Sequence, residues 1–116
     1  MRILICLFAL SIAVAAQEPI YEPGNGVSLP SAVKQVRAQY TQEGRDAHIE
    51  GTVVLSTVVL ADGSVGEVNV TRSLDTTYGL DAEAVKAMKQ WEFKPGTKDG
   101  KAVAVRVSVN MTFTLK

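Results

Sequence analysis

The clearest pattern in the sequence is an alternation of apolar and polar residues near the C-terminus. Every odd position from 103 to 115 is apolar, and the even positions are polar apart from Ala104. Because successive side chains of a strand point to opposite faces, this period of two predicts one long amphipathic strand. A strand of this length extends past a shorter hairpin and leaves part of its own backbone unpaired.

A second β pattern lies in the middle of the chain. Residues 49–60 are rich in β-branched side chains and apolar on both faces, which predicts a central strand covered on both sides. The following segment contains Asp62-Gly63, a pair that favours a tight hairpin turn, and residues 65–72 alternate again. The two runs therefore predict a β-hairpin.

Residues 80–91 have the spacing of an amphipathic helix. Asp81 is the expected N-cap, and Leu80 and Val85 are placed to pack against each other across the first turn. The predicted apolar face consists of Leu80, Ala84, Ala87, Met88 and Trp91. Residues 94–100, with two glycines and a proline, predict a connecting loop.

The segments before the hairpin are less regular. Residues 17–30 hold three of the four prolines and predict an extended leader without regular structure. Residues 31–39 are compatible with a short helix that begins at Ser31, and residues 41–48 with a further helical turn that begins at Thr41. Gly44 weakens that turn by about 1 kcal/mol relative to alanine. The predicted class is α+β, a two-layer fold with a small antiparallel β-β-α-β sheet and helices on one face.

The first sixteen residues have the layout of a secretory signal peptide. Arg2 precedes an uncharged apolar run, and small residues follow before charge returns at Glu18. We expect cleavage after Ala16, with Ala15 as the alternative, and export of the mature chain. An uncleaved membrane anchor is the other interpretation, although a spanning helix needs about 20 apolar residues. The predicted organisation is a signal peptide over 1–16, a leader over 17–30 and one domain over 31–116.

Composition narrows the classes of function. Formal charge is zero over 116 residues, and it becomes −1 over the remaining 100 when the signal peptide and Arg2 are removed. A nucleic-acid binder normally has a marked basic excess, so we expect no nucleic-acid partner. The single cysteine, Cys6, lies in the segment predicted to be cleaved, so the mature domain depends on its core for stability.

Candidate chemistry is sparse. His48 has no cysteine or second histidine near it, which favours a surface or capping residue over a metal ligand. Asp75, Asp81 and Glu83 could form paired carboxylates, but capping and a solvated first turn explain Asp81 and Glu83. Trp91, Phe93 and Met88 are better explained as core than as a binding box. We therefore predict no catalytic residue, no metal site, no cofactor and no small-molecule substrate.

An ordered set of motifs resembles a known family. The set begins with Ile-x-Gly-Thr-Val-Val-Leu (49–55), Ala-Asp-Gly-Ser-Val (61–65) and Gly-Leu-Asp-x-Glu-Ala-Val (79–85). It continues with Lys-Gln-Trp-Glu-Phe-Lys-Pro-Gly (89–96), Asp-Gly-Lys-Ala-Val (99–103) and Phe-Thr-Leu (113–115). The order over about residues 27–116 resembles the C-terminal domain of TonB-family energy transducers.

The resemblance implies a docking function in the periplasm. In that family the last strand of the sheet accepts a short peptide of an outer-membrane transporter as an additional strand, a mode of binding known as β-augmentation. The strand corresponds by position to 102–115, and the implied partner-binding residues are Val103, Ala104, Val105, Arg106, Val107, Ser108, Val109 and Asn110. The short leader implies a docking module without the membrane anchor and long spacer of a transducer.

Two other hypotheses remain open at the level of sequence. The long last strand could pair with its copy across a twofold axis and make a structural homodimer. A small enzyme or inhibitor on the same scaffold is the third hypothesis, although no nucleophile–base pair is evident. An envelope protein other than a transporter is an alternative partner for the docking module.

Overall fold

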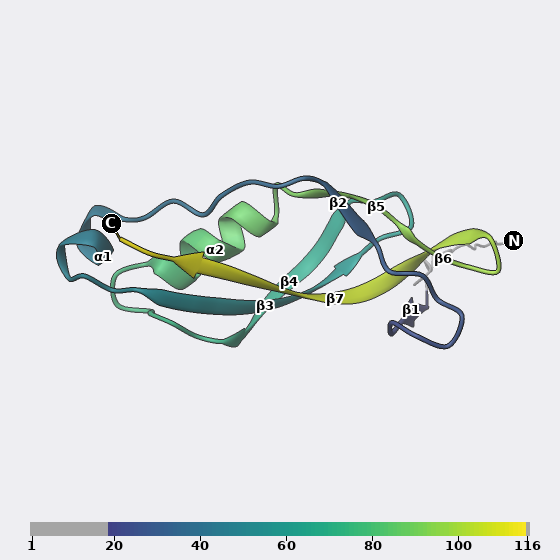
Figure 1. Cartoon of the computed structure of the whole chain (residues 1–116), viewed down its shortest axis with the longest axis horizontal. Coiled ribbons are helices and arrows are strands. Elements are labelled where there is room, and N and C mark those ends of the chain that lie inside the picture. The colour runs from purple at the N-terminus through teal and green to yellow at the C-terminus, as the bar shows by residue number, and fades with distance from the viewer. Residues whose placement is uncertain (1–18, 116) are drawn as a thin grey trace, which may run out of the picture.

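A computed structural model describes residues 19–115, so the predicted signal peptide and its cleavage site lie outside the described residues. The long strands lie side by side, with α1 at the end of the molecule near the C-terminus and α2 alongside the strands (Figure 1). In chain order the elements are β1 (Ile20–Tyr21), β2 (Ser31–Lys34), α1 (Gln42–Asp46), β3 (Gly51–Val59), β4 (Val65–Arg72), α2 (Leu80–Met88), β5 (Glu92–Lys94), β6 (Gly96–Lys98) and β7 (Lys101–Phe113).

The main sheet has the strand order β1-β7-β3-β4, with β6 also paired to β7. The predicted hairpin is confirmed as β3 and β4, and Gly63 adopts a φ of 89° in its turn. The predicted last strand is confirmed as β7, which pairs antiparallel with β3 from Val59↔Val105 to Gly51↔Phe113. The prediction of a long amphipathic strand beside a hairpin therefore holds.

Helix α2 packs on one face of this sheet and forms the core with it. The alternation along β7 turns its odd-numbered side chains to the same face as Val53 and Leu55 of β3, because directly paired residues share a face. The buried cluster consists of Val53, Leu55, Leu80, Ala84, Ala87, Met88, Met111 and Phe113. This arrangement confirms the α+β class, with helices on one face of a small and mainly antiparallel sheet.

The other face of β3 differs from its prediction. The strand is central, as expected, but Thr52, Val54 and Ser56 are only half-buried. Their partners on β7 are Thr112, Asn110 and Ser108, all of them exposed and polar. The prediction of cover on both faces is wrong for this stretch, because the cross-strand neighbours make that face a polar surface.

Residues 31–39 do not form the predicted helix. Ser31–Lys34 is the strand β2, which pairs antiparallel with β5 in a separate two-stranded sheet. The indole Nε1 of Trp91 then donates to the carbonyl oxygen of Val36 at 2.9 Å and holds the chain extended beyond the strand. Pairing with a distant segment outweighs the weak local preference of this short polar stretch for a helix.

The leader is more ordered than the sequence predicts. Ile20 and Tyr21 form β1, which pairs parallel with Ala104 and Val105 of β7. Val27 is bridged to Gly24 and to Lys98. The predicted loop over 94–100 likewise contains β6, which forms a tight hairpin with β7 at Asp99-Gly100.

The two helices confirm one predicted cap and correct another. Thr41 caps α1 as predicted, since its hydroxyl accepts from the Gly44 N–H at 2.9 Å. Helix α2 runs from Leu80 to Met88, so it ends three residues before its predicted end at Trp91. Its N-cap is Gly79 at a φ of 86° and not Asp81. Only glycine adopts such a φ without strain, which lets the loop turn into the helix while Asp81 points back to the loop.

Candidate functional site

Strand β7 changes partners along its length: β6 pairs with Lys101–Val103, and β3 pairs with Val105–Phe113. On the side away from β3, β1 pairs with Ala104 and Val105. From Arg106 to Phe113 the only strand partner among residues 19–115 is β3. Half of the backbone N–H and C=O groups over this stretch therefore face away from the sheet and remain available for a further strand.

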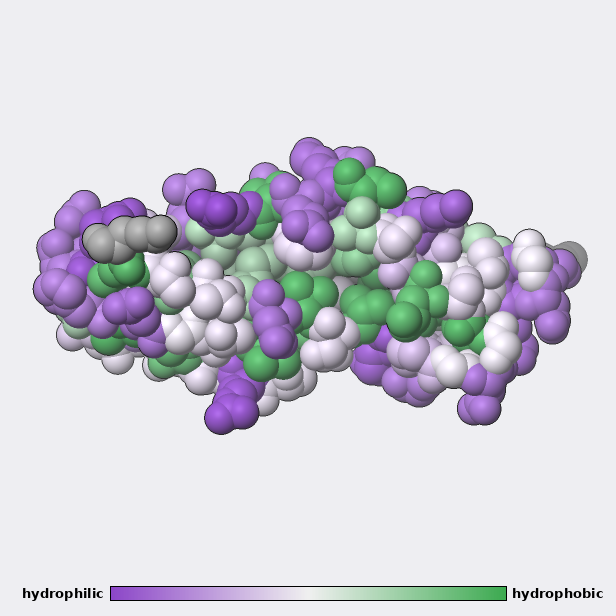
Figure 2. Space-filling view, viewed as in Figure 1, coloured by the Kyte–Doolittle hydropathy of each residue, from purple (hydrophilic) through white to green (hydrophobic). Residues whose placement is uncertain are grey.

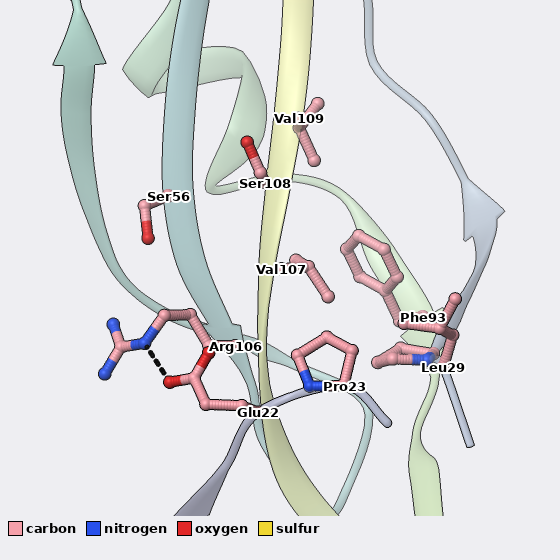
Figure 3. Close-up of a pocket in the computed structure, with 10 residues that line it drawn as sticks. Glu22, Pro23, Leu29, Ser56, Phe93, Arg106, Val107, Ser108 and Val109 are labelled. Carbon is pink, nitrogen blue, oxygen red and sulfur yellow. Dashed lines mark hydrogen bonds and ion pairs between the residues drawn. The ribbon is translucent and has the colours of Figure 1, made fainter. Parts of the chain in front are cut away.

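A groove lies along this unpaired side. Its first part has a volume of about 410 Å³ and is bounded by Arg106–Val109 of β7 together with Pro23, Leu29 and Phe93. Its second part, of about 430 Å³, follows Asn110–Thr112 and is bounded by residues 35–38 and Trp91. We call the two parts together the edge groove. Figure 3 shows Pro23, Leu29 and Phe93 on one side of β7 and Ser56 on the other.

The wall opposite β7 is held by contacts that are remote in sequence. The bond from Trp91 to the Val36 carbonyl fixes the second part of the wall, and the β2–β5 ladder fixes the first. Trp91 and Phe93 also pack against each other at 5.9 Å between ring centroids. Because all of these contacts are within the domain itself, the groove is present in the unbound protein.

The first part of the groove is mainly apolar and includes Arg106, whereas the second part is more polar and includes Arg37. Leu29 is 65% exposed, which is high for a leucine, and apolar surface gathers in the middle of the visible face between hydrophilic ends (Figure 2). The guanidinium Nε of Arg106 lies 3.0 Å from Glu22 Oε2, and this contact is drawn in Figure 3. Such a surface suits an extended segment that buries apolar side chains along β7.

The eight residues implied by the family resemblance all lie on β7, but not in equivalent positions. Val103 pairs with Gly96, and Ala104 and Val105 pair with β1, so these three have a strand beside them. The other five have β3 on one side only: Arg106, Val107, Ser108, Val109 and Asn110. The unpaired stretch also continues to Phe113, beyond the predicted set.

Several residues of the groove were missed at the level of sequence. Glu22, Pro23 and Leu29 line it from the leader, which was predicted to lack regular structure. Phe93 also lines the groove. Trp91 and Phe93 pack against the hydrophobic core as well, which agrees with the prediction that both belong to the core. The proline-rich composition of the leader gave no signal for this position, because the pairing that places it is long-range.

The three acidic residues considered for catalysis are structural. The Asp75 carboxylate accepts from the backbone N–H groups of Thr77, Tyr78 and Leu80 at 3.0–3.1 Å. Glu83 forms an ion pair with Lys86. Residues 19–115 contain no cluster of histidine, cysteine and acidic side chains that could hold a metal ion.

Asp81 holds the same loop from within the helix. Its carboxylate accepts from the N–H groups of Leu74 and Asp75 at 2.9 and 3.0 Å. Burial acts to raise the pKa of this carboxyl, but hydrogen bonds from the Asp75 backbone, the Ser73 side chain and the Leu74 backbone outweigh it and lower the pKa below its usual value. The charged form is therefore the one that the fold prefers.

His48 and Met88 agree with their predictions. His48 is exposed, and its backbone N–H donates to the carbonyl oxygen of Arg45 at the end of α1. The residue therefore occupies a surface position that caps the helix. Met88 is fully buried. No helix within residues 19–115 has the length and hydropathy needed to cross a membrane.

Comparisons with known proteins identify relatives of this chain. The model of the Gram-negative bacterial TonB protein C-terminal family matches residues 36–115. Protein tonB2 of Pseudomonas aeruginosa is 46% identical over 66 residues, which cover 57% of this chain and 24% of that protein. Protein TonB of Vibrio cholerae is 35% identical over 91 residues, covering 78% of this chain and 37% of that protein. The chain thus spans between 24% and 37% of the length of these relatives.

A solved structure supports the fold independently. The solution NMR structure of the Pseudomonas aeruginosa TonB C-terminal domain superposes with a TM-score of 0.62 at 21% identity. The superposition covers 87% of this chain and 97% of that one. The family model covers most of the described residues, including all of β7. The chain belongs to the TonB C-terminal domain family.

Proposed function

We propose that this protein is a periplasmic docking module that binds an extended segment of an outer-membrane transporter by strand addition in TonB-type transport. The observation that supports this most strongly is the unpaired side of β7 from Arg106 onward, with a preformed apolar groove beside it. Membership of the family supports a transporter as the class of partner. The proposed binding residues are Arg106–Asn110, with the stretch up to Thr112 as their continuation.

The physical account separates affinity from selectivity. Each backbone hydrogen bond to the added strand contributes about 0.5–1.5 kcal/mol, whatever the partner's side chains are. Side chains of the partner that enter the groove at Leu29 and Phe93 add a term that depends on their size and apolar area. A partner whose sequence alternates small and apolar residues is therefore favoured over a uniformly charged one.

The test is a proline scan of β7 against synthetic peptides that copy periplasmic segments of outer-membrane transporters. Consecutive residues of β7 direct their N–H groups to opposite sides, so one of two pairs removes outward donors: Arg106→Pro with Ser108→Pro, or Val107→Pro with Val109→Pro. We expect the outward pair to abolish peptide binding while circular dichroism shows a retained fold. The inward pair is expected to weaken the β3 ladder and lower the melting temperature.

Alanine substitutions at the same positions are the matched controls. They remove the side chain and keep the backbone N–H, so the alanine variant of the outward pair is expected to retain most of the binding. The proposal is wrong if variants of both pairs fold and bind the peptides as the unsubstituted protein does.

The unpaired side of β7 is also the observation that favours the second candidate, pairing of two copies of the chain. Static light scattering over a range of concentrations separates the two functions. A mass that stays at one chain up to high concentration excludes the paired form, and a mass of two chains that falls on addition of peptide indicates that both use the same edge.

A further inference from the structure

The N-terminal arm, defined here as residues 19–23, occupies the beginning of the edge that a partner strand would use. Ile20 and Tyr21 pair with Ala104 and Val105 on the side of β7 away from β3. Glu22 then reaches Arg106, and Pro23 lines the first part of the groove. The arm therefore ends where the unpaired stretch of β7 begins.

Few contacts hold this arm in place. The parallel ladder is only two residues long, and Ile20 remains 48% exposed. The ion pair joins two side chains that are largely open to solvent, where screening leaves little net attraction. The ring of Tyr21 lies 5.6 Å from Lys98 Nζ, again near the surface. An arm held in this way opens far more readily than the strands of the core.

A turn and an anchor follow the arm directly. Gly24, Asn25 and Gly26 all have positive φ values, of 100°, 54° and 85°, and the Val27 N–H donates to the Gly24 carbonyl at 3.1 Å. The next residue is fixed to β6, because the Ser28 N–H donates to the Thr97 carbonyl at 2.8 Å and the two hydroxyls lie 2.9 Å apart. The arm can therefore leave β7 about this turn without disturbing residues beyond Val27.

We propose that the arm is a built-in competitor for the edge of β7. While the arm is docked, a partner strand can pair with β7 only from Arg106 onward. When the arm leaves, the backbone of Val105 and Ala104 also becomes available for pairing. A long partner strand binds only those molecules in which the arm has left the edge. The apparent affinity for such a strand therefore equals the intrinsic affinity multiplied by the fraction of molecules with a free edge. This inference rests on the proposed function, since it concerns the same strand.

The first test loosens the arm and measures the affinity of the same transporter peptides by calorimetry. Glu22→Gln removes the charge that meets Arg106 and keeps the length of the side chain. We expect it to tighten binding of peptides long enough to reach Ala104 by about two- to fivefold relative to peptides that end at Arg106, because both kinds of peptide meet the freed Arg106 and an exposed ion pair is weak. Glu67→Gln on the exposed surface of β4 is the matched control and is expected to change neither.

The second test locks the arm. Neighbouring strands are about 4.8 Å apart, which is within the Cα separation that a disulfide accepts, so Ile20→Cys with Ala104→Cys joins a directly paired position. In a Cys6→Ser background no other thiol competes. The oxidised protein is expected to bind long peptides at least tenfold more weakly than its reduced form, and reduction serves as the internal control for folding.

The two proposals fail in different ways. Long peptides that bind equally well to the locked, reduced and Glu22→Gln proteins overturn the competitor and leave the docking function intact. Peptides that bind none of these proteins, the loosened one included, overturn the docking function and the competitor together.

Discussion

The edge groove and the acidic loop at the start of α2 use backbone polar groups in opposite ways. In the loop, which we define as residues 73–81, two buried carboxylates accept hydrogen bonds from the surrounding N–H groups. Along β7 from Arg106 onward, the N–H and C=O groups on one side have no strand partner among the described residues. The hydrogen bonds of the loop stabilise the fold, whereas the unpaired groups of β7 are available to bind a further strand.

This contrast separates the two regions by what their backbone polar groups are bonded to. Buried carboxylates often mark an active site, but here their hydrogen bonds are used within the loop itself. The side chains of Val107, Ser108 and Val109 are chemically ordinary, and the proposed recognition depends on the backbone that bears them. Substitutions should therefore separate the two regions, with stability changing in one and affinity in the other.

Asp75→Ala is expected to have the largest effect. It leaves three loop N–H groups without their acceptor, and we expect the free energy of unfolding to fall by about 3 kcal/mol. Urea denaturation measures this change, and peptide affinity should be unaltered under native conditions. Glu83→Ala, which removes only an ion pair with the exposed Lys86, is the control and should cost less than about 0.5 kcal/mol. A loss of under 1 kcal/mol for Asp75→Ala would mean that the loop does not depend on its carboxylate.

Gly44→Ala is expected to destabilise although alanine is the better helix former. A Cβ at this position would meet Leu80 Cδ2 and Thr41 Oγ1 at 2.9 Å, and the N–H of Leu80 is bound by Asp75. Overpacking costs about 1–3 kcal/mol and the helix preference returns about 1 kcal/mol, so a net loss of about 1 kcal/mol follows. Thermal unfolding tests this, with the exposed Gln42→Ala as a neutral control, and a raised melting temperature would contradict it.

Leu29→Ala is expected to lower peptide affinity and to leave the stability of the fold nearly unchanged. Because Leu29 is 65% exposed, the substitution should change the free energy of unfolding by less than about 0.5 kcal/mol. It removes apolar surface from the groove, so peptide affinity should fall by a few-fold. Val33→Ala is the matched control, since Val33 is 67% exposed on the same segment but does not line the groove. Equal effects of the two substitutions on affinity would show that the groove is not used.

The acidic loop also predicts a dependence of stability on pH. Because the folded protein lowers the pKa of Asp81, this carboxyl stabilises the fold above its unfolded pKa of about 3.9. That contribution is lost as the pH falls through the lowered folded pKa. Asp81→Asn keeps an acceptor oxygen and removes the titration, so its stability should fall less steeply than that of the unsubstituted protein below pH ~4. Parallel acid-unfolding curves for the two proteins would contradict this.

The sequence predicted those elements whose pattern is local. The alternation along β7, the Asp62-Gly63 turn and the apolar face of α2 up to Met88 each follow from spacing alone, and each is present. Trp91 was predicted on that face but lies beyond the end of the helix. Thr41 was also identified as a cap from its position before a helical turn. Such features depend on neighbours within a few residues, so they can be inferred without knowing the fold.

The parts that were predicted wrongly depend on long-range pairing. Residues 31–39 are held extended by β5 and Trp91, which lie about 55–63 residues further along the chain. The pairing of β1 with β7 joins positions about 84 residues apart, and no local pattern marks it. The strand β7 of the edge groove has a local pattern and was predicted. The wall opposite β7 is held by long-range contacts, so it was not predicted.

Amide hydrogen exchange of β7, measured by NMR with and without a transporter peptide, tests strand addition most directly. We predict that the peptide slows exchange at alternate residues within Arg106–Thr112, those whose N–H groups face away from β3, and leaves the exposed side of β4 unchanged. Protection that lacks this period of two, or that appears on β4 in place of β7, would contradict the account.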